Sequence, residues 1–497
     1  MTGPGPNRLA RLFVVIGCLP GLSGCAGGLF ATVGPDYSPP AVTAAASWQA
    51  SREGEVAHKG STAKLADWWA QFNDRALDTL ISAAQKQSST LTQAVAAIER
   101  ARADAITAGV AGYPDLTAVG SVNRSAFTLG GPLALRTQSQ LGVQSQWEID
   151  LFGGLARERE SRQATLEANV SLWHDARVSL AAEVANAYVN FRYCEIQVSQ
   201  TEAESRSRSE TARMTGSAAK AGLQSKTAAQ LAQGAAADSA GALLQRRAQC
   251  DIAIKGLVFL TAIKEPALRK LLKDARPSGD RLPEPARFRI EAVPARVIAQ
   301  RPDIAAAERQ LAAASAEIGG AESDRYPRLT LAGNITPTRI AIGSSPALSL
   351  TPWSIAPSLS LPLFDGGRRK ANVDAARAQY ASAESAYRSR VRNAVREVEE
   401  ALVRLESAAS REAQARAASS SYRATLDAAR EMQRVGLGSA LDVEESRRLL
   451  LATESNLSSL AQERVAAWIA LYRAVGGGWD GTAGDSLTVN YPSKQTP

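Results

Sequence analysis

Few side chains in this 497-residue chain could carry chemistry: it has four cysteines and two histidines. A thiol can be acylated or oxidised to a disulfide, and a histidine can bind a metal or act as a base. Two histidines, His58 and His174, are too few for a histidine-based metal cluster and give little material for Ser-His-Asp catalysis. No Walker-type phosphate loop occurs. We therefore expect no enzymatic activity, no metal site and no cofactor.

Cys25 is the first thiol with a recognisable chemical context. It ends the sequence Leu22-Ser23-Gly24-Cys25, which follows two arginines and an eight-residue apolar run at 12–19. Such a run is typical of a secretory signal and is too short to span a bilayer. The four residues resemble the bacterial lipobox, whose cysteine is acylated, with palmitate among the acyl groups. Ala26, where an inner-membrane lipoprotein has aspartate, favours the outer membrane. We predict a signal peptide at 1–24 and acylation of Cys25.

The mature chain contains two further cysteines, Cys194 and Cys250. They lie at equal separations in sequence before and after Gly222. If the chain forms a helical hairpin that turns at Gly222, the two thiols lie at the same height, and a disulfide is feasible in an oxidising compartment. Two buried free thiols are the alternative.

Composition and charge indicate long helices with solvated surfaces. Aromatic residues make up 5% of the chain, and alanine, serine, glutamine and arginine fill long tracts, which is typical of helices with small-residue seams. The net charge of +8 comes from bases interleaved with acids, so we expect no nucleic-acid partner. No run of 18 apolar residues occurs, so any membrane crossing by the mature chain must use β-strands.

The chain contains an internal repeat, in which segments of the first half recur in the second half in the same order and at a nearly constant offset. The matching pairs are Tyr113–Thr117 with Tyr326–Thr330, Gly153-Gly154 with Gly366-Gly367, Glu183-Val184 with Glu397-Val398, and Gly222–Ser225 with Gly436–Ser439. Each half is therefore predicted to follow one plan: helix, strand, loop, strand, long helix, turn and long helix.

Each repeat is predicted to contain two strands of about ten residues, a length that suits a tilted transmembrane strand. The predicted strands are Leu116–Asn123, Gln140–Asp150, Leu329–Thr336 and Ser354–Leu363, with turn-rich loops at Gly130-Gly131-Pro132 and Gly343–Pro346. Membrane barrels need about eight strands to close, and an open sheet edge is not tolerated in lipid. Two or three copies of the chain must therefore share one barrel.

Two very long helices without proline follow the strands, at Leu155–Ala221 and Arg368–Val435. Helices at Thr227–Thr261 and Ala440–Val475 return, which predicts two antiparallel hairpins whose tips lie far from the strands. Steps of three, four or seven along the second long helix predict a coiled-coil seam, formed by Val373, Tyr380, Tyr387, Val391, Val395, Val398, Leu402 and Leu405.

Several stretches together resemble one known family. They are Val33–Tyr37 with Pro39-Pro40, the segment around Trp68-Trp69, Phe72 and Asp74, Val293–Leu311, and Ala470–Trp479. The chain resembles an outer-membrane factor of the TolC/NodT type, in the lipoprotein branch with the OprM-like channels of resistance-nodulation-division efflux systems. The resemblance covers nearly the whole mature chain.

This resemblance implies an α+β membrane protein with a TolC-like fold. It implies a homotrimer whose copies share a twelve-stranded β-barrel in the cell outer membrane, four strands per chain, continuous with a periplasmic α-helical barrel. The channel would passively conduct small molecules, such as drugs or other toxic compounds, to the exterior. Its partners would be outer-membrane lipid, a periplasmic membrane-fusion adaptor protein and, through the adaptor, a proton-driven inner-membrane pump.

The predicted organisation has five parts. They are a signal peptide at 1–24, an N-terminal extended segment at 25–66, a first outer-membrane efflux repeat at 67–285, a second repeat at 286–480 and a flexible C-terminal tail at 481–497.

The resemblance also implies two kinds of site near the hairpin tips. Adaptor contact is implied for Gly222, Leu223, Ser225, Val435, Gly436, Leu437 and Ser439, although the turn alone would explain the glycines. A ring of three symmetric carboxylates could close the lumen, and the candidates are Asp427, Glu431, Asp442 and Glu445. A solvated acidic surface near a helix end explains these acids equally well.

Two other functions are compatible with parts of the sequence. The same fold could serve as the exit duct of a type I protein secretion system, or the chain could be a non-conducting structural coiled-coil lipoprotein. The paired strands and the repeat argue against the second alternative, and the lipobox with Val293–Leu311 favours the efflux branch over the first. The sequence does not specify the transported substrate.

Overall fold

The computed structural model describes residues 31–40, 68–128, 133–275, 282–284, 298–477 and 479. Cys25 with the predicted signal peptide, the loop at 130–132, residues 293–297 and the tail at 481–497 lie outside the described residues.

The chain forms two compact units. Unit one comprises Met1–Ser38, Ala101–Thr165 and Leu311–Ala383, and unit two comprises Pro39–Arg100, Leu166–Gln310 and Glu384–Pro497. Each unit contains residues from both sequence repeats, because strands and helices of one repeat pack against those of the other.

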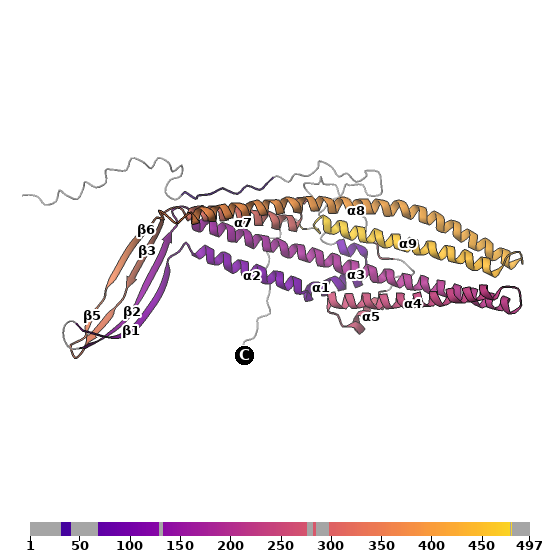
Figure 1. The fold of residues 1–497 in the computed structure, drawn as a ribbon, viewed down its shortest axis with the longest axis horizontal. Helices are drawn as coiled ribbons and strands as arrows, with labels where there is room; N and C mark the ends of the chain where they lie inside the picture. Colours follow the sequence, from indigo (N-terminus) through magenta and orange to yellow (C-terminus); the bar gives the residue numbers. More distant parts are fainter. Residues whose placement is uncertain are drawn as a thin grey trace, which may run out of the picture. The chain divides into compact units, whose positions relative to one another are not determined.

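Both repeats fold into the same order of elements (Figure 1). After a 3₁₀ turn, η2 (Trp68–Phe72), the first repeat contains α1 (Arg75–Gln87), α2 (Ser89–Val110), β1 (Asp115–Phe127), β2 (Ala134–Ile149), α3 (Gly154–Lys220) and α4 (Lys226–Thr261), and α5 (Glu265–Asp274) follows. The second contains α7 (Pro302–Ser323), β3 (Arg328–Ile335), β4 (Thr338–Ile342), β5 (Leu348–Leu350), β6 (Trp353–Ser360), α8 (Arg368–Arg434) and α9 (Ala440–Ala474). The predicted bounds of α3, α4, α8 and α9 are confirmed to within one residue.

The sheet of unit one consists of four antiparallel strand lines. β2 pairs with β1 on one side and with β3 and β4 on the other, in a single continuous register. β6 and β5 pair with β3 and β4 in the same way. The two lines of the second repeat break at the same level, at Thr336-Pro337 and Thr351-Pro352, since proline has no N–H to donate to a ladder. There the Thr336 N–H donates to the Pro352 carbonyl at 3.0 Å.

The prediction of two strands in each repeat is confirmed as two strand lines, and Leu329–Thr336 matches β3 to within one residue. The predicted lengths of about ten residues were wrong for β1 and β2, which have 13 and 16 residues. In the second repeat β3 and β6 have 8 residues each, and the lines continue as β4 and β5 with 5 and 3. β-Propensity alone did not reveal where β1 and β2 end, because serine, threonine and glutamine continue beyond the predicted segments on the loop side.

Glycines turn the chain from each sheet hairpin into its long helix, as predicted. Gly153 has φ +75°, and Gly366 and Gly367 have φ +67° and +92°, the left-handed region that favours glycine. Asp150 accepts a hydrogen bond from the Ala156 N–H at 2.9 Å, and Asp365 accepts one from the Arg369 N–H at 3.1 Å. In both long helices an aspartate therefore accepts a hydrogen bond from an N–H group of the first turn, which has no partner within the helix.

The core of unit two joins the first and last helices of the described chain. The fully buried Trp68 ring stacks on Tyr472 with 4.7 Å between centroids, and Trp69 contacts the same ring edge-on at 4.6 Å. Burial raises the pKa of Tyr472 to about 12. The Tyr188 hydroxyl of α3 donates to Asp74, which also caps the N-terminus of α1. Aromatic stacking and one shared carboxylate thus fix α1, α3 and α9 together.

The predicted seam of α8 is confirmed. Its buried members are Val373, Tyr387, Val391, Val398, Leu402 and Leu405, whereas Tyr380 and Val395 are half-buried. In the part of the chain that the structure describes, none of the helices is both long and apolar enough to cross a membrane.

A buried arginine explains the sequence Arg301-Pro302-Asp303 in unit two. The Arg301 guanidinium makes two hydrogen bonds of 2.9 Å to Asp303, donates to the Ala474 carbonyl at 2.8 Å, and lies 2.8 Å from Glu397. Its side chain is 6% exposed. Arg301 therefore ties the start of α7 to the end of α9 and to the middle of α8.

We expect Arg301→Gln to destabilise the protein by about 3–5 kcal/mol, because it leaves Asp303 and Glu397 without their buried cation. Thermal unfolding of the purified protein, followed by circular dichroism, measures the change. Arg388→Gln is the control: Arg388 pairs with Glu384 on an exposed helix face, so its loss should cost less than about 1 kcal/mol. Equal effects of the two substitutions would contradict this role for Arg301.

Candidate functional site

Over β1, β2, β3 and β6, one face of the sheet is predominantly apolar. Residues paired directly across an antiparallel ladder project to the same face, so the register assigns each side chain to a face. Leu116, Leu141, Trp353 and Ile355 on this face are each 69–72% exposed. The short strands β4 and β5 differ, because the same register places Ile340, Ile342, Leu348 and Leu350 on the opposite face. The apolar residues that β1, β2, β3 and β6 place on the apolar face are Leu116, Ala118, Val122, Ala126, Leu135, Leu141, Val143, Trp147, Ile149, Leu329, Leu331, Ile335, Trp353, Ile355, Pro357 and Leu359.

The opposite face is predominantly polar. Its polar residues are Thr117, Ser121, Asn123, Arg136, Gln138, Gln140, Gln144, Gln146, Thr330, Asn334, Ser354 and Ser358. Arg136 donates to Gln138 at 2.5 Å, Gln138 to Gln140 at 3.4 Å, and Asn334 to Ser354 at 2.8 Å. Neighbouring polar side chains on this face therefore form hydrogen bonds with one another, as is expected of a surface in contact with water.

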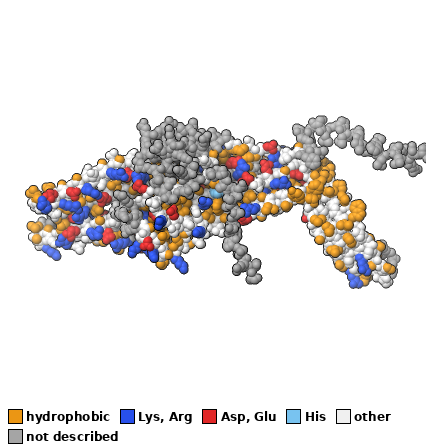
Figure 2. All heavy atoms as spheres, turned by 180° about the vertical axis from the view of Figure 1, so that it is seen from behind, with side chains coloured by type: hydrophobic (Ala, Val, Ile, Leu, Met, Phe, Trp, Pro, Cys, Tyr) orange, Lys and Arg blue, Asp and Glu red, His pale blue; other side chains and the backbone are white. Residues whose placement is uncertain are grey.

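A sheet built in this way separates lipid from water. Figure 2 shows hydrophobic side chains spread over the strands of unit one, with charged side chains gathered toward the loop end. So continuous an exposed apolar surface is not stable in water and indicates contact with lipid or protein. The alternation of apolar and polar faces matches that of membrane-spanning strands with a wet interior.

The two hairpin tips in unit two have the same backbone geometry. Gly222 and Gly436 have φ +74° and +79°. The Leu223 N–H donates to the Ala218 carbonyl at 2.8 Å, and the Leu437 N–H to the Met432 carbonyl at 2.9 Å. These are Schellman closures, which favour glycine at the left-handed position and commonly have an apolar residue directly after it.

The side chains at these tips are of two kinds. Ser225 and Ser439 cap the returning helices α4 and α9, and so have a structural role. Leu223, Leu437 and Val435 are 79%, 77% and 52% exposed. The turn motif favours an apolar residue after the glycine, but both leucines stay largely exposed, so these side chains are available to a partner.

Each predicted gate carboxylate has a partner within the described chain. Asp427 lies 3.2 Å from Arg430, Glu431 pairs with Arg434, and Glu445 pairs with Arg448. Hydrogen bonds from the N–H and hydroxyl of Ser439 hold the pKa of Asp442 below its usual value. Because that pKa is lowered on folding, the stability from this cap is present above the unfolded-state pKa and is lost as the pH falls through the folded-state pKa.

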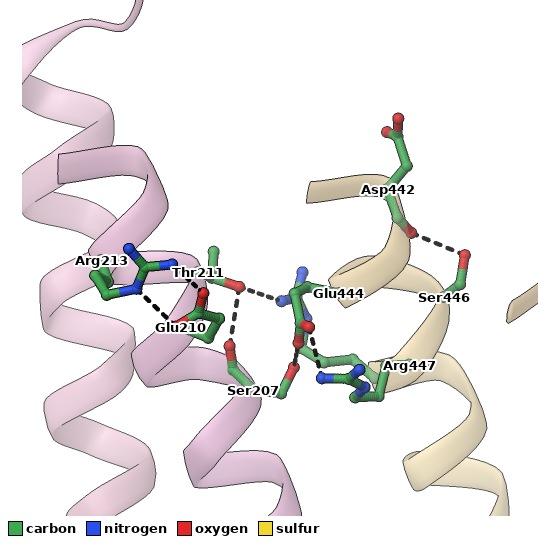
Figure 3. Close-up of polar contacts among 9 residues, drawn as sticks. Ser207, Glu210, Thr211, Arg213, Asp442, Glu444, Ser446 and Arg447 are labelled. Atoms are coloured by element: carbon green, nitrogen blue, oxygen red, sulfur yellow. Dashed lines mark hydrogen bonds and ion pairs between the residues drawn. The ribbon is translucent and has the colours of Figure 1, made fainter. Parts of the chain in front are cut away.

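The carboxylate buried between the two hairpins is Glu444, which the sequence analysis missed. Figure 3 shows it between α3 and α9, where it accepts a hydrogen bond from the buried Ser207 hydroxyl and lies 2.6 Å from Arg447. Nearby, Arg448 donates to Thr211 at 3.3 Å. Asp442 and Glu445 were chosen for their charge, but the residue that joins the hairpins lies between them. No local sequence pattern distinguished Glu444 from the acidic residues around it.

Each hairpin is cross-linked along its length. Cys194 on α3 and Cys250 on α4 form a disulfide, with Cα atoms 5.6 Å apart. At the equivalent level of the second hairpin, Arg464 on α9 contacts Glu412 on α8 at 2.5 Å, and both side chains are nearly buried.

The fold and these surfaces define a class of protein: a membrane-embedded channel subunit that combines an amphipathic sheet with long helical hairpins. The family model described as outer membrane efflux protein matches residues 80–262 and 293–477. This chain therefore belongs to the outer membrane efflux protein family, and it is an outer-membrane channel component of an efflux system.

The chain aligns with relatives and solved structures over most of its length. It is 31% identical over 471 residues to Nodulation protein T of Rhizobium leguminosarum bv. trifolii, covering 93% of this chain and 96% of the relative. It is 27% identical to the cation efflux system protein CusC of Escherichia coli O6:H1, covering 92% and 96%. The structure of the outer-membrane channel OprN superimposes with a TM-score of 0.76 at 28% identity, covering 90% and 100%.

The assignment of the sheet faces predicts opposite reactivity at two neighbouring positions of β2. We expect Gln144→Cys to react with a membrane-impermeant maleimide in intact cells at least about tenfold faster than Val143→Cys, because Gln144 faces the wet wall and Val143 the apolar face. The unsubstituted chain gives the background. Equal labelling rates would contradict this assignment of faces.

The disulfide closes a loop between residues 56 apart in sequence. We expect Cys194→Ser together with Cys250→Ser to lower stability by up to about 4 kcal/mol, since the unfolded chain regains the entropy of that loop. Thermal unfolding with and without reductant measures it: reductant should destabilise the parent and leave the double variant unchanged. A parent that is insensitive to reductant after full reduction would contradict the prediction.

Proposed function

We propose that three copies of this chain form one passive channel through the outer membrane, without enzymatic activity of their own. Small molecules would enter it from a periplasmic adaptor protein, which connects it to a proton-driven pump in the inner membrane. The observation that carries this proposal is the sheet with one apolar and one polar face.

The edges of the sheet support an assembly of several copies. Within the described part of this chain, β1 lies at one edge and β6 with β5 at the other. When such an edge lies in lipid, its backbone N–H and C=O groups need hydrogen-bond partners that lipid does not supply. If β1 of one copy pairs with β6 of the next, both edges are satisfied. Three copies would then supply twelve strand lines around a wet interior.

The ends of the assembly would be fixed by lipid and by the adaptor. Acylation of Cys25 would attach the N-terminus to outer-membrane lipid, although the apolar face of the sheet offers much more area for burial. The exposed leucines of the hairpin tips would contact the adaptor. The candidates for the ring that closes the lumen are still Asp427, Glu431, Asp442 and Glu445. Each of them is bonded to an arginine or a serine, so a ring of carboxylates would either break these contacts or include the partner side chains.

Substrate retention in cells lacking this chain tests the proposal. We expect one class among dyes, antibiotics, aromatic acids and metal ions to accumulate, and re-expression to restore its export. The strain should also lack other outer-membrane channels of this family, so that none substitutes. Loss of a secreted polypeptide from the medium, with no accumulation of small molecules, would instead indicate a protein secretion duct.

The second hairpin tip offers a sharper test of adaptor contact. We expect Leu437→Asp to reduce efflux at least about tenfold, because a carboxylate would have to be desolvated at the contact. Trimers on a semi-native gel should be unaffected, since the side chain is exposed. Gln433→Asp adds the same charge one turn earlier and should retain efflux. Undiminished efflux by Leu437→Asp would rule out contact at this tip.

A further inference from the structure

The segment Thr32–Tyr37 lies against unit one, where β2 turns into α3. It is part of the indigo trace in Figure 1. The Val33 N–H donates to the Phe152 carbonyl of that turn at 3.1 Å. Tyr37 packs against Ala164 of α3 and the alanines of α7 at positions 312 and 313. We call Thr32–Tyr37 the strap.

Three glycines let the strap approach the backbone closely. A Cβ added at Gly34 would lie 2.3 Å from the Cα of Gly319 in α7, and one added at Gly319 would lie 2.8 Å from the Val33 carbonyl oxygen. A Cβ at Gly153 would lie 2.5 Å from the Thr32 side chain. Real Cβ atoms do not come so close, so the strap fits only because all three positions lack a side chain.

One buried arginine holds the strap from the other side. The Arg157 residue, on the first turn of α3, is 4% exposed. Its guanidinium donates to the Val33 carbonyl at 3.1 Å, to the Gly34 carbonyl at 3.4 Å and to Asp36 at 2.7 Å, and its remaining nitrogen pairs with Glu160 at 2.8 Å. A guanidinium buried in this way loses its solvation, and the strap supplies most of the acceptors that replace it.

The second repeat provides an internal comparison. Gly366, the counterpart of Gly153, has no atom within 4 Å of an added Cβ among the described residues. The counterpart of Gly319 is Ile106, which is 61% exposed. The turn alone therefore accounts for Gly153, since Gly366 makes the same turn with no described residue against it. Gly319 is different, because its helix position in the other repeat accepts an isoleucine, and its own contact is with the strap.

We propose that the strap is a clamp that ties the acylated N-terminus to the turn between β2 and α3 and holds that turn against α7. This rests on the proposed function only for the acyl group at Cys25. Six residues lie between Cys25 and Thr32, and the seven steps from one Cα to the next span at most about 24 Å, so a docked strap limits how far from this turn the lipid can insert. Arg157 and Gly319 are positioning residues in this clamp.

Two adjacent glycines of α7 give a matched test. Gly319→Ala places a Cβ into the strap and Arg157, whereas Gly320→Ala meets nothing within 4 Å. Both changes gain the same intrinsic helix propensity. Each is made in the full-length chain carrying Val33→Cys, and the purified protein is used for two measurements: the rate of labelling by a maleimide and the temperature of thermal unfolding.

We expect Gly319→Ala to label about tenfold faster than Gly320→Ala and to unfold several degrees lower. Equal labelling would overturn docking, and faster labelling with an unchanged unfolding temperature would overturn the clamp. If Gly319→Ala does not fold, Gly34→Ala carries the same test, because it alters the strap alone. Neither measurement depends on transport, so a negative result here is distinguishable from a failure of the proposed efflux function.

Discussion

The need to satisfy every backbone hydrogen bond of the sheet constrains the rest of this structure. Four strand lines present an apolar face that calls for lipid, yet in the described chain both outer lines lack a neighbour on one side. Lipid offers no donors or acceptors to such edges. The polar face, with its row of glutamines, needs water for the same reason. Assembly with further copies around a wet interior meets all of these demands at once.

The helices of unit two face a different constraint, which is that their sequences offer little apolar surface to bury. Long tracts rich in alanine and arginine bury little apolar surface per residue, so the core of unit two depends on a few large contacts. The ring stack of Trp68 on Tyr472 and the buried cation of Arg301 both involve the end of α9. The polar contact of Glu444 with Ser207 joins the two hairpins. One hydrophobic core thus joins α1, α3, α4, α5, α8 and α9, and toward the hairpin tips the bundle is held by a small separate cluster and by the polar contact of Glu444.

The sequence predicted the elements whose signals are local and repeated. Glycine at Gly222 and Gly436 marks the hairpin tips, and the duplicated order places the long helices to within one residue. The lengths of β1 and β2 were wrong because serine, threonine and glutamine continue beyond the predicted segments on the loop side. The continuation of the second repeat's lines as β4 and β5, past Pro337 and Pro352, was not predicted. The docking of Gly34 on Gly319 could not be predicted, since the two glycines lie far apart in sequence and neither shows a local pattern. Glu444 was missed because acidic neighbours hid its buried position.

The cross-links of the two hairpins show how the halves of a duplicated chain can diverge. The first hairpin is joined by Cys194 and Cys250, while Arg464 and Glu412 join the second at the equivalent level. A disulfide forms only after export, when an oxidant is available, and once formed it is not affected by salt or pH. An ion pair forms as soon as the helices meet and needs no oxidant. The two halves of one gene product therefore mature under different requirements, because only the first hairpin depends on an oxidising compartment for its cross-link.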